Sequence, residues 1–114
     1  MPDTPSPQEE TDRLCVALHK RLTQLFFDVS TESDGSYKPN YMRKQVGDLG
    51  GYDAACNLVM CTGGTSGFHK LIGLQLPKLT VEYIILTGPW RDIMPDEVVE
   101  RARNRLQEVG VVVP

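Results

Sequence analysis

The residues best suited to bind a metal ion are three cysteines and two histidines: Cys15, His19, Cys56, Cys61 and His69. Cys15 and His19 are four positions apart, so they would lie on the same face of a helix. Structural zinc sites usually contain close Cys-x-x-Cys or His-x-x-x-His pairs, and the sequence has neither. We therefore expect no metal ion and no bound cofactor, and we interpret Cys56 and Cys61 as small apolar residues in or near the core.

Nucleophilic catalysis would need a base beside the nucleophile, and either histidine could serve only if the fold brought it close to a cysteine. The sequence arranges no Ser, His and Asp in a recognisable local motif. Residues 61–67, CTGGTSG, precede a predicted helix but lack the Gly-x-x-x-x-Gly-Lys-Ser/Thr spacing of a nucleotide-binding loop. We expect no catalytic residue, and the sequence leans against an enzyme without deciding the question.

Glu82 is the polar residue that most needs a partner. It lies within residues 67–86, the longest apolar-rich passage of the chain. A carboxylate buried there costs free energy unless it is paired. Four arginines could supply the partner: Arg91, Arg101, Arg103 and Arg105. We favour an ion pair that locks two helices over a functional acid. The candidate functional or helix-locking residues are Glu82, Arg103, His69 and Trp90.

Apolar residues recur at spacings of three and four, the pattern of amphipathic helices. Residues 1–8 contain three prolines and predict a disordered arm, which leaves residues 9–114 for a helical domain. The first helix begins at Thr11 or Asp12, and its buried positions are Leu14, Leu18, Leu22, Leu25 and Val29. Further helices are expected over residues 40–49, 52–61, 66–76 and 95–109.

Residues 79–86 are ambiguous between helix and strand. The segment VEYIIL within them is rich in β-branched and aromatic residues, and periodicity cannot settle so short a run. We favour a helix because every neighbouring segment is predicted helical and the sequence offers no partner strand.

Composition and charge exclude several classes of protein. Apolar residues make up 40% of the 114 residues and charged residues 24%, which is typical of one globular domain. The net charge of −3 and the interleaving of arginines with glutamates in the last helix disfavour a nucleic-acid partner. The chain begins with no signal-peptide pattern and has no membrane-spanning run, and its odd cysteine number does not suggest disulfides. We expect a soluble, cytoplasmic protein.

Three passages are similar to a helical module that recurs in uncharacterised bacterial proteins. They are YKPNYMRKQVGDLGGYDAACNLV, SGFHKLIGLQLPKLTVEYIIL and MPDEVVERARNRLQEVG, and together they cover residues 27–110 for the most part. The resembling elements are a Tyr-x-Pro, a Gly-Phe-x-x-Leu helix, a Leu-Thr-Val-Glu segment and an Ala-Arg-x-Arg-Leu helix. The resemblance implies an all-helical fold and brings no catalytic residue.

The sequence as a whole predicts an all-α single domain of five to six helices. The function it favours is a small non-enzymatic interaction or accessory module. Its partner would be another protein or a second copy of the chain, bound through an exposed Trp90, Met94 and the VVVP tail. The alternatives are a small enzyme or ligand-binding protein with a site near residues 63–67, and a nucleic-acid-binding adaptor.

Overall fold

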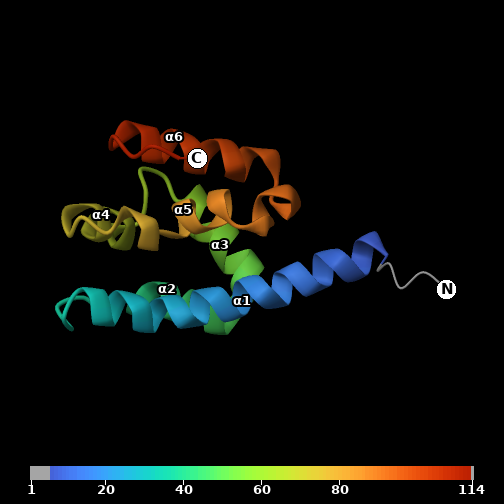
Figure 1. Cartoon of the computed structure of the whole chain (residues 1–114), viewed down its shortest axis with the longest axis horizontal. Helices are drawn as coiled ribbons and strands as arrows, with labels where there is room; N and C mark the ends of the chain where they lie inside the picture. The colour runs from blue at the N-terminus through green and yellow to red at the C-terminus, as the bar shows by residue number, and fades with distance from the viewer. Residues whose placement is uncertain (1–5, 114) are drawn as a thin grey trace.

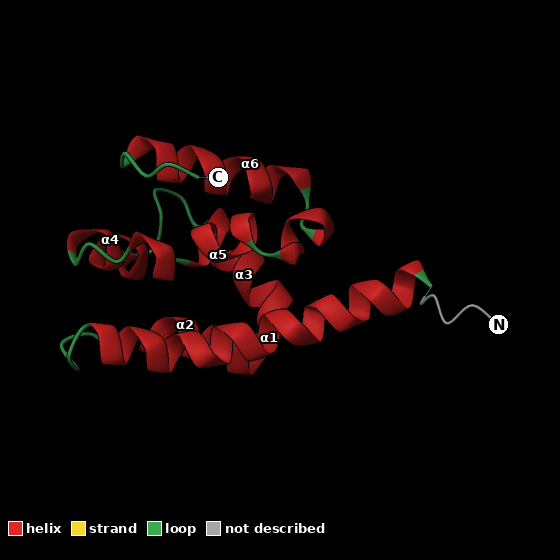
Figure 2. Cartoon of the chain, viewed as in Figure 1, coloured by secondary structure: helices red, strands yellow, loops and turns green. Residues whose placement is uncertain are grey.

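The chain folds into α-helices and two short 3-10 helices (Figure 2), and the computed structural model, which describes residues 6–113, contains no strand in that range. The elements are α1 (Pro7–Glu32), α2 (Asn40–Leu49), α3 (Gly51–Met60), α4 (Ser66–Gly73), η1 (Pro77–Leu79), α5 (Val81–Thr87), η2 (Pro89–Ile93) and α6 (Asp96–Glu108). The predicted all-α single domain is confirmed.

Helix α1 begins earlier than its apolar pattern predicts. The Ser6 hydroxyl accepts a hydrogen bond from the Glu9 N–H at 3.2 Å, and Pro7 occupies the first helical position. Proline is favoured there because that N–H would have no helical partner and the ring fixes a helical φ. Pro7 and Gln8 therefore belong to α1, whereas residues 1–5 of the predicted arm lie outside the described residues.

Helix α3 is the centre of the fold. It contacts α1 and α2 on one side and α5 and α6 on the other. Figure 1 shows α1 and α2 side by side along one face of the molecule, with α6 along the opposite face. Of the five predicted core positions of α1, Leu18, Leu22 and Val29 are fully buried and Leu25 is 2% exposed, whereas Leu14 is only partly buried. The first turns of α1 extend beyond the other helices (Figure 1).

Helices α1 and α3 approach each other closely at Gly51. The Gly51 N–H donates a hydrogen bond to Nδ1 of His19 at 3.1 Å. Because Gly50, the residue before α3, offers no side chain, His19 acts as the cap of this helix from a distant part of the chain. A Cβ atom at position 51 would lie 2.5 Å from Cα of His19. The two backbones can therefore meet only where this residue is glycine.

The ambiguous segment 79–86 is helical, as favoured. Pro77 opens η1, and the Thr80 hydroxyl then accepts the Tyr83 N–H at 3.2 Å, which caps the start of α5. Helix α5 packs against α3, α6 and η2. Val81, Ile84 and Ile85 are buried against other helices, so tertiary packing overrides the preference of these β-branched residues for strands.

The prediction that Trp90 and Met94 are exposed is wrong. Trp90 is 9% exposed and Met94 is 5% exposed. The 3-10 helix η2 folds back against α1, where the Trp90 indole N–H donates a hydrogen bond to the Leu14 carbonyl at 2.9 Å. Met94 lies at the end of η2, with its sulfur 3.9 Å from Sγ of Cys56. Both side chains therefore fill the core. Of the predicted contact surface within the described residues, only Val112 is exposed, at 87%, because Val111 and Val113 pack partly against the core.

Candidate functional site

The central polar feature of the molecule is a buried ion pair between α5 and α6. The guanidinium of Arg105 donates a hydrogen bond to Oε2 of Glu82 at 2.9 Å. Glu82 is 3% exposed and Arg105 is 8% exposed. Glu82 lies in the first turn of α5 and Arg105 in the last turn of α6, so the pair joins the two helices directly. The structure thus contains the helix-locking pair that the position of Glu82 suggested.

Arg103, which the sequence selected for this role, does not take part in the pair. Residues two apart on a helix point in widely different directions, and the inner face of α6 is the one that carries Ala102, Arg105 and Leu106. Arg103 is half-buried and lines a shallow groove beside the C-terminal tail. The sequence offers Arg105 as one of four possible partners of Glu82, and only the orientation of α6 selects it.

Arg105 also binds the end of α3. Its guanidinium donates to the carbonyl oxygen of Val59 at 2.6 Å and to that of Cys61 at 2.7 Å. Arg101, one turn earlier on α6, donates to the intervening carbonyl of Met60 at 2.8 Å. The last carbonyls of a helix lack helical partners and carry the negative end of its dipole. Two arginines of α6 therefore cap the C-terminus of α3 from a different part of the chain.

The pKa of the Glu82 carboxyl is raised above its ordinary value of 4.5 because burial disfavours the charged form, and the bond to Arg105 offsets part of that rise. The folded state then holds the proton more tightly than the unfolded chain. The contribution of Glu82 to stability is therefore fully present below pH 4.5 and is lost as the pH rises through the pKa of the folded state.

Replacement of Glu82 with glutamine tests this pH dependence. The free energy of unfolding of the wild type minus that of E82Q is expected to fall as the pH rises from about 4.5 towards neutrality. Urea denaturation at a series of pH values measures the difference. A difference that grows with pH would show that Arg105 stabilises the charged carboxylate by more than burial costs it.

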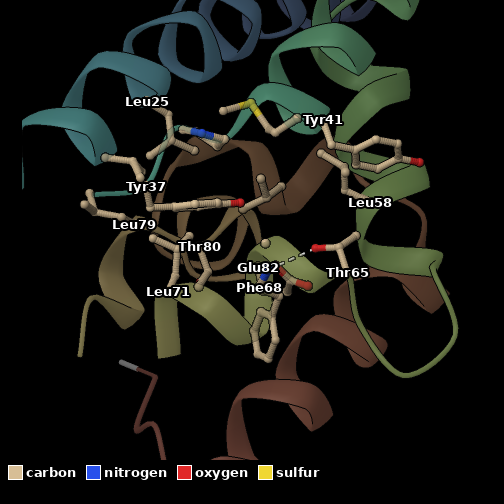
Figure 3. A pocket seen from close by; sticks show the side chains of 15 residues that line it. Leu25, Tyr37, Tyr41, Leu58, Thr65, Phe68, Leu71, Leu79, Thr80 and Glu82 are labelled. Carbon is tan, nitrogen blue, oxygen red and sulfur yellow. Dashed lines mark hydrogen bonds between the residues drawn. The ribbon is translucent and has the colours of Figure 1, made fainter. Parts of the chain in front are cut away.

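A small cavity of about 40 Å³ lies beside the ion pair, between α1, α2, α4 and α5. Its walls are largely apolar. The Thr80 hydroxyl in the wall is already bonded to the Pro77 carbonyl and the Tyr83 N–H, and further polar groups come from Tyr37, Thr65 and Glu82. Figure 3 shows these three side chains directed towards the same space, with the Thr65 hydroxyl bonded to the Phe68 N–H at 3.0 Å. Tyr37 was not among the candidate residues predicted from the sequence, and the signal that could have indicated it is the Tyr-x-Pro motif that it begins.

His69 is exposed and does not line this cavity. Its Nε2 lies 2.7 Å from the carbonyl oxygen of Gly63, so the side chain braces the turn between α3 and α4. It faces a wide groove of about 560 Å³ between that turn and α6, which Arg101 and Asn104 also line. The groove and the cavity share Phe68 as a wall, but Glu82 lines only the cavity, His69 lines only the groove, and Cys61 lines neither.

The cysteines are poorly suited to nucleophilic chemistry. Burial, together with nearby carboxylates, raises the pKa of the Cys15 and Cys56 thiols, which keeps them protonated at neutral pH. Cys56 is partly buried against the core, as predicted, but Cys61 is exposed at the end of α3, so its predicted place in or near the core is wrong. Between residues 6 and 113, no three His, Cys, Asp or Glu side chains are grouped closely enough to hold a metal ion.

Comparison with known proteins finds no relative: no family model, no curated protein and no solved structure matches the chain. The described helices also include none with the length and apolar character that crossing a lipid bilayer requires.

Proposed function

We propose that this protein is a small non-enzymatic interaction or accessory module of the bacterial helical type that it resembles, located in the cytoplasm. The observation that supports this proposal is that its best candidate chemical groups serve as structural contacts. Arg105 is bonded to Glu82 and to two carbonyls, and His19 and His69 are each bonded to the backbone of another segment. A catalytic centre needs polar groups that converge on a substrate, and these groups are used to join helices.

The first candidate partner is a second copy of the chain, bound through the C-terminal tail. Val112 is the most exposed large apolar side chain in the described range, and Val109 nearby is 37% exposed. The backbone before the tail is fixed, because the Val111 N–H donates to the Leu106 carbonyl at 2.9 Å. An apolar side chain held in water on an ordered segment gains free energy when a partner covers it.

Light scattering coupled to size-exclusion chromatography tests self-association. We expect the mass to rise above the 12.7 kDa of one chain as the protein concentration increases, and Val112→Asp to return it to the monomer value. Val16→Asp is the matched control, since Val16 is an exposed valine (56%) on α1, away from the tail in sequence. A monomer mass at every concentration would contradict self-association.

The second candidate is a small ligand-binding protein, and the cavity beside Glu82 favours it. Thr65, which caps α4, lines this cavity together with Gly67 and residues 79–82 of the 67–86 passage. Mostly apolar cavities with a few convergent polar groups are the usual form of a ligand site. A nucleic-acid partner is less well supported, because Arg21, Lys44 and Arg105 each pair with a carboxylate of the same chain.

A further inference from the structure

The cavity beside Glu82 separates its apolar and polar surfaces. Its apolar walls come from six elements, α1 to α5 and η1, and include Leu25, Val29, Met42, Leu58, Phe68 and Leu71. A water molecule needs at least about 10–15 Å³ of such space, so a cavity of about 40 Å³ holds roughly three water-sized groups. That is enough for the end of a small molecule and too little for the whole of a large one. A ligand larger than the cavity must therefore place one of its ends inside and leave the rest of the molecule outside.

The polar groups of the cavity offer two donors and one acceptor. The Thr65 oxygen accepts the Phe68 N–H, so its own hydroxyl hydrogen is available to donate. The Tyr37 hydroxyl forms no hydrogen bond with any residue of the described chain, and burial raises the pKa of Tyr37. Arg105 binds Oε2 of Glu82, which leaves Oε1 to accept from a ligand. A hydroxyl group, with one donor and two acceptor positions, complements this set.

The charge balance of the cavity disfavours a ligand with an ammonium or carboxylate end group. Glu82 and Arg105 together are neutral, so an ammonium or carboxylate group in the cavity would be a buried charge with no counter-ion of its own. A neutral hydroxyl carries no such cost. Tyr41, 61% exposed, contributes to the cavity wall and marks its opening to solvent. Figure 3 shows the Tyr41 ring directed away from the polar groups, so a chain could leave beside it.

We propose that this cavity binds the hydroxyl end of a small neutral aliphatic alcohol, hydrogen-bonded by Tyr37, Thr65 and Glu82, with its carbon chain leaving past Tyr41. This inference rests on the second function proposed above, ligand binding, and names the chemical class of the ligand. It is independent of self-association through the tail.

Saturation-transfer NMR with three probes of equal chain length tests the class of ligand: 1-hexanol, hexylammonium and hexanoate. We expect a saturation-transfer signal from 1-hexanol and none from the two ions. A titration followed by protein amide correlation spectra should show chemical-shift changes at Leu71 and Thr65 with 1-hexanol alone. Binding of either ion at comparable affinity would overturn the alcohol assignment and leave ligand binding in place. Binding of none of the probes up to the solubility limit of hexanol would overturn both.

Two conservative variants test the site. Tyr37→Phe removes only a hydroxyl without a partner in the chain, so the protein should fold normally and bind 1-hexanol about threefold to tenfold more weakly. Tyr41→Phe, the matched control at the rim, should bind it as the wild type does. Equal affinity in all three proteins would overturn the role of Tyr37. A crystal soaked in 1-hexanol that shows only water in the cavity would overturn the site.

Discussion

Replacement of Arg105 with methionine is expected to lower the free energy of unfolding by about 3–5 kcal/mol, the usual effect of removing one partner of a buried ion pair. Methionine keeps much of the apolar bulk of the side chain but leaves Glu82 without its counter-ion. It also leaves the carbonyls of Val59 and Cys61 without the donors that cap α3. Urea denaturation followed by far-UV circular dichroism measures the change.

Arg103→Met is the matched control for this experiment. Arg103 is on the same helix but outside the ion pair, so its replacement should change the free energy of unfolding by no more than about 0.5 kcal/mol. If Arg105→Met costs less than about 1 kcal/mol, the pair contributes no more than an exposed one does. The interpretation of Glu82 and Arg105 as a helix lock would then be wrong.

Replacement of Gly51 with alanine is expected to destabilise the protein by about 1–3 kcal/mol or more, as overpacking of a close contact does. The new Cβ atom would lie 2.5 Å from Cα and 2.7 Å from N of His19. Both are backbone atoms of a long helix, so no side-chain rotation can relieve the overlap. Helices α1 and α3 would have to separate, which would also break the bond between His19 and the Gly51 N–H.

Gly47→Ala provides a control of opposite sign. Gly47 lies inside α2, and a Cβ atom there would meet no heavy atom within 4 Å. Alanine is favoured over glycine in a helix by about 1 kcal/mol, so this variant should be stabilised. Thermal unfolding of both variants measures the two effects. A Gly51→Ala protein as stable as the wild type would contradict the close approach of α1 and α3.

The ion pair and the arginine caps give α6 a specific part in the fold. Arg101 and Arg105 hold three consecutive carbonyls at the end of α3, and Arg105 also holds Glu82 at the start of α5. Charged groups are rarely so deeply buried without a partner, and here both members of the pair are bonded to another helix, which offsets part of the cost of burying Glu82. The polar residues at the centre of the protein therefore fix the relative positions of α3, α5 and α6.

The secondary structure was largely predictable from the sequence because it depends on local patterns. The apolar spacing of Leu18, Leu22, Leu25 and Val29 defines a helical face whatever that face contacts. Caps were harder to assign, since α1 uses Ser6 and Pro7 rather than Thr11 or Asp12. Several residues that can cap a helix precede the apolar face of α1. Which of them begins the helix depends on small differences in free energy.

The site was only partly predictable. The sequence indicated that Glu82 needs a positive partner, because an apolar neighbourhood makes an unpaired carboxylate costly. It could not distinguish Arg105 from Arg103, and it placed Trp90 on the surface although the Trp90 indole is bonded to Leu14, 76 positions away. The cavity residue Tyr37 had no chemical signal of its own, since its role depends on lying beside Thr65 and Glu82.

The sequence by itself determined the all-α class, the helical faces and the need for a partner at Glu82, because each follows from residues within a few positions of one another. Only the tertiary structure decided that Arg105 is that partner, that His19 caps α3, and that Trp90 is buried. These contacts join segments far apart in the chain, and they depend on how the helices are rotated and docked. Local spacing carries no information about that rotation, so the packing of the whole domain is what selects among residues of the same type.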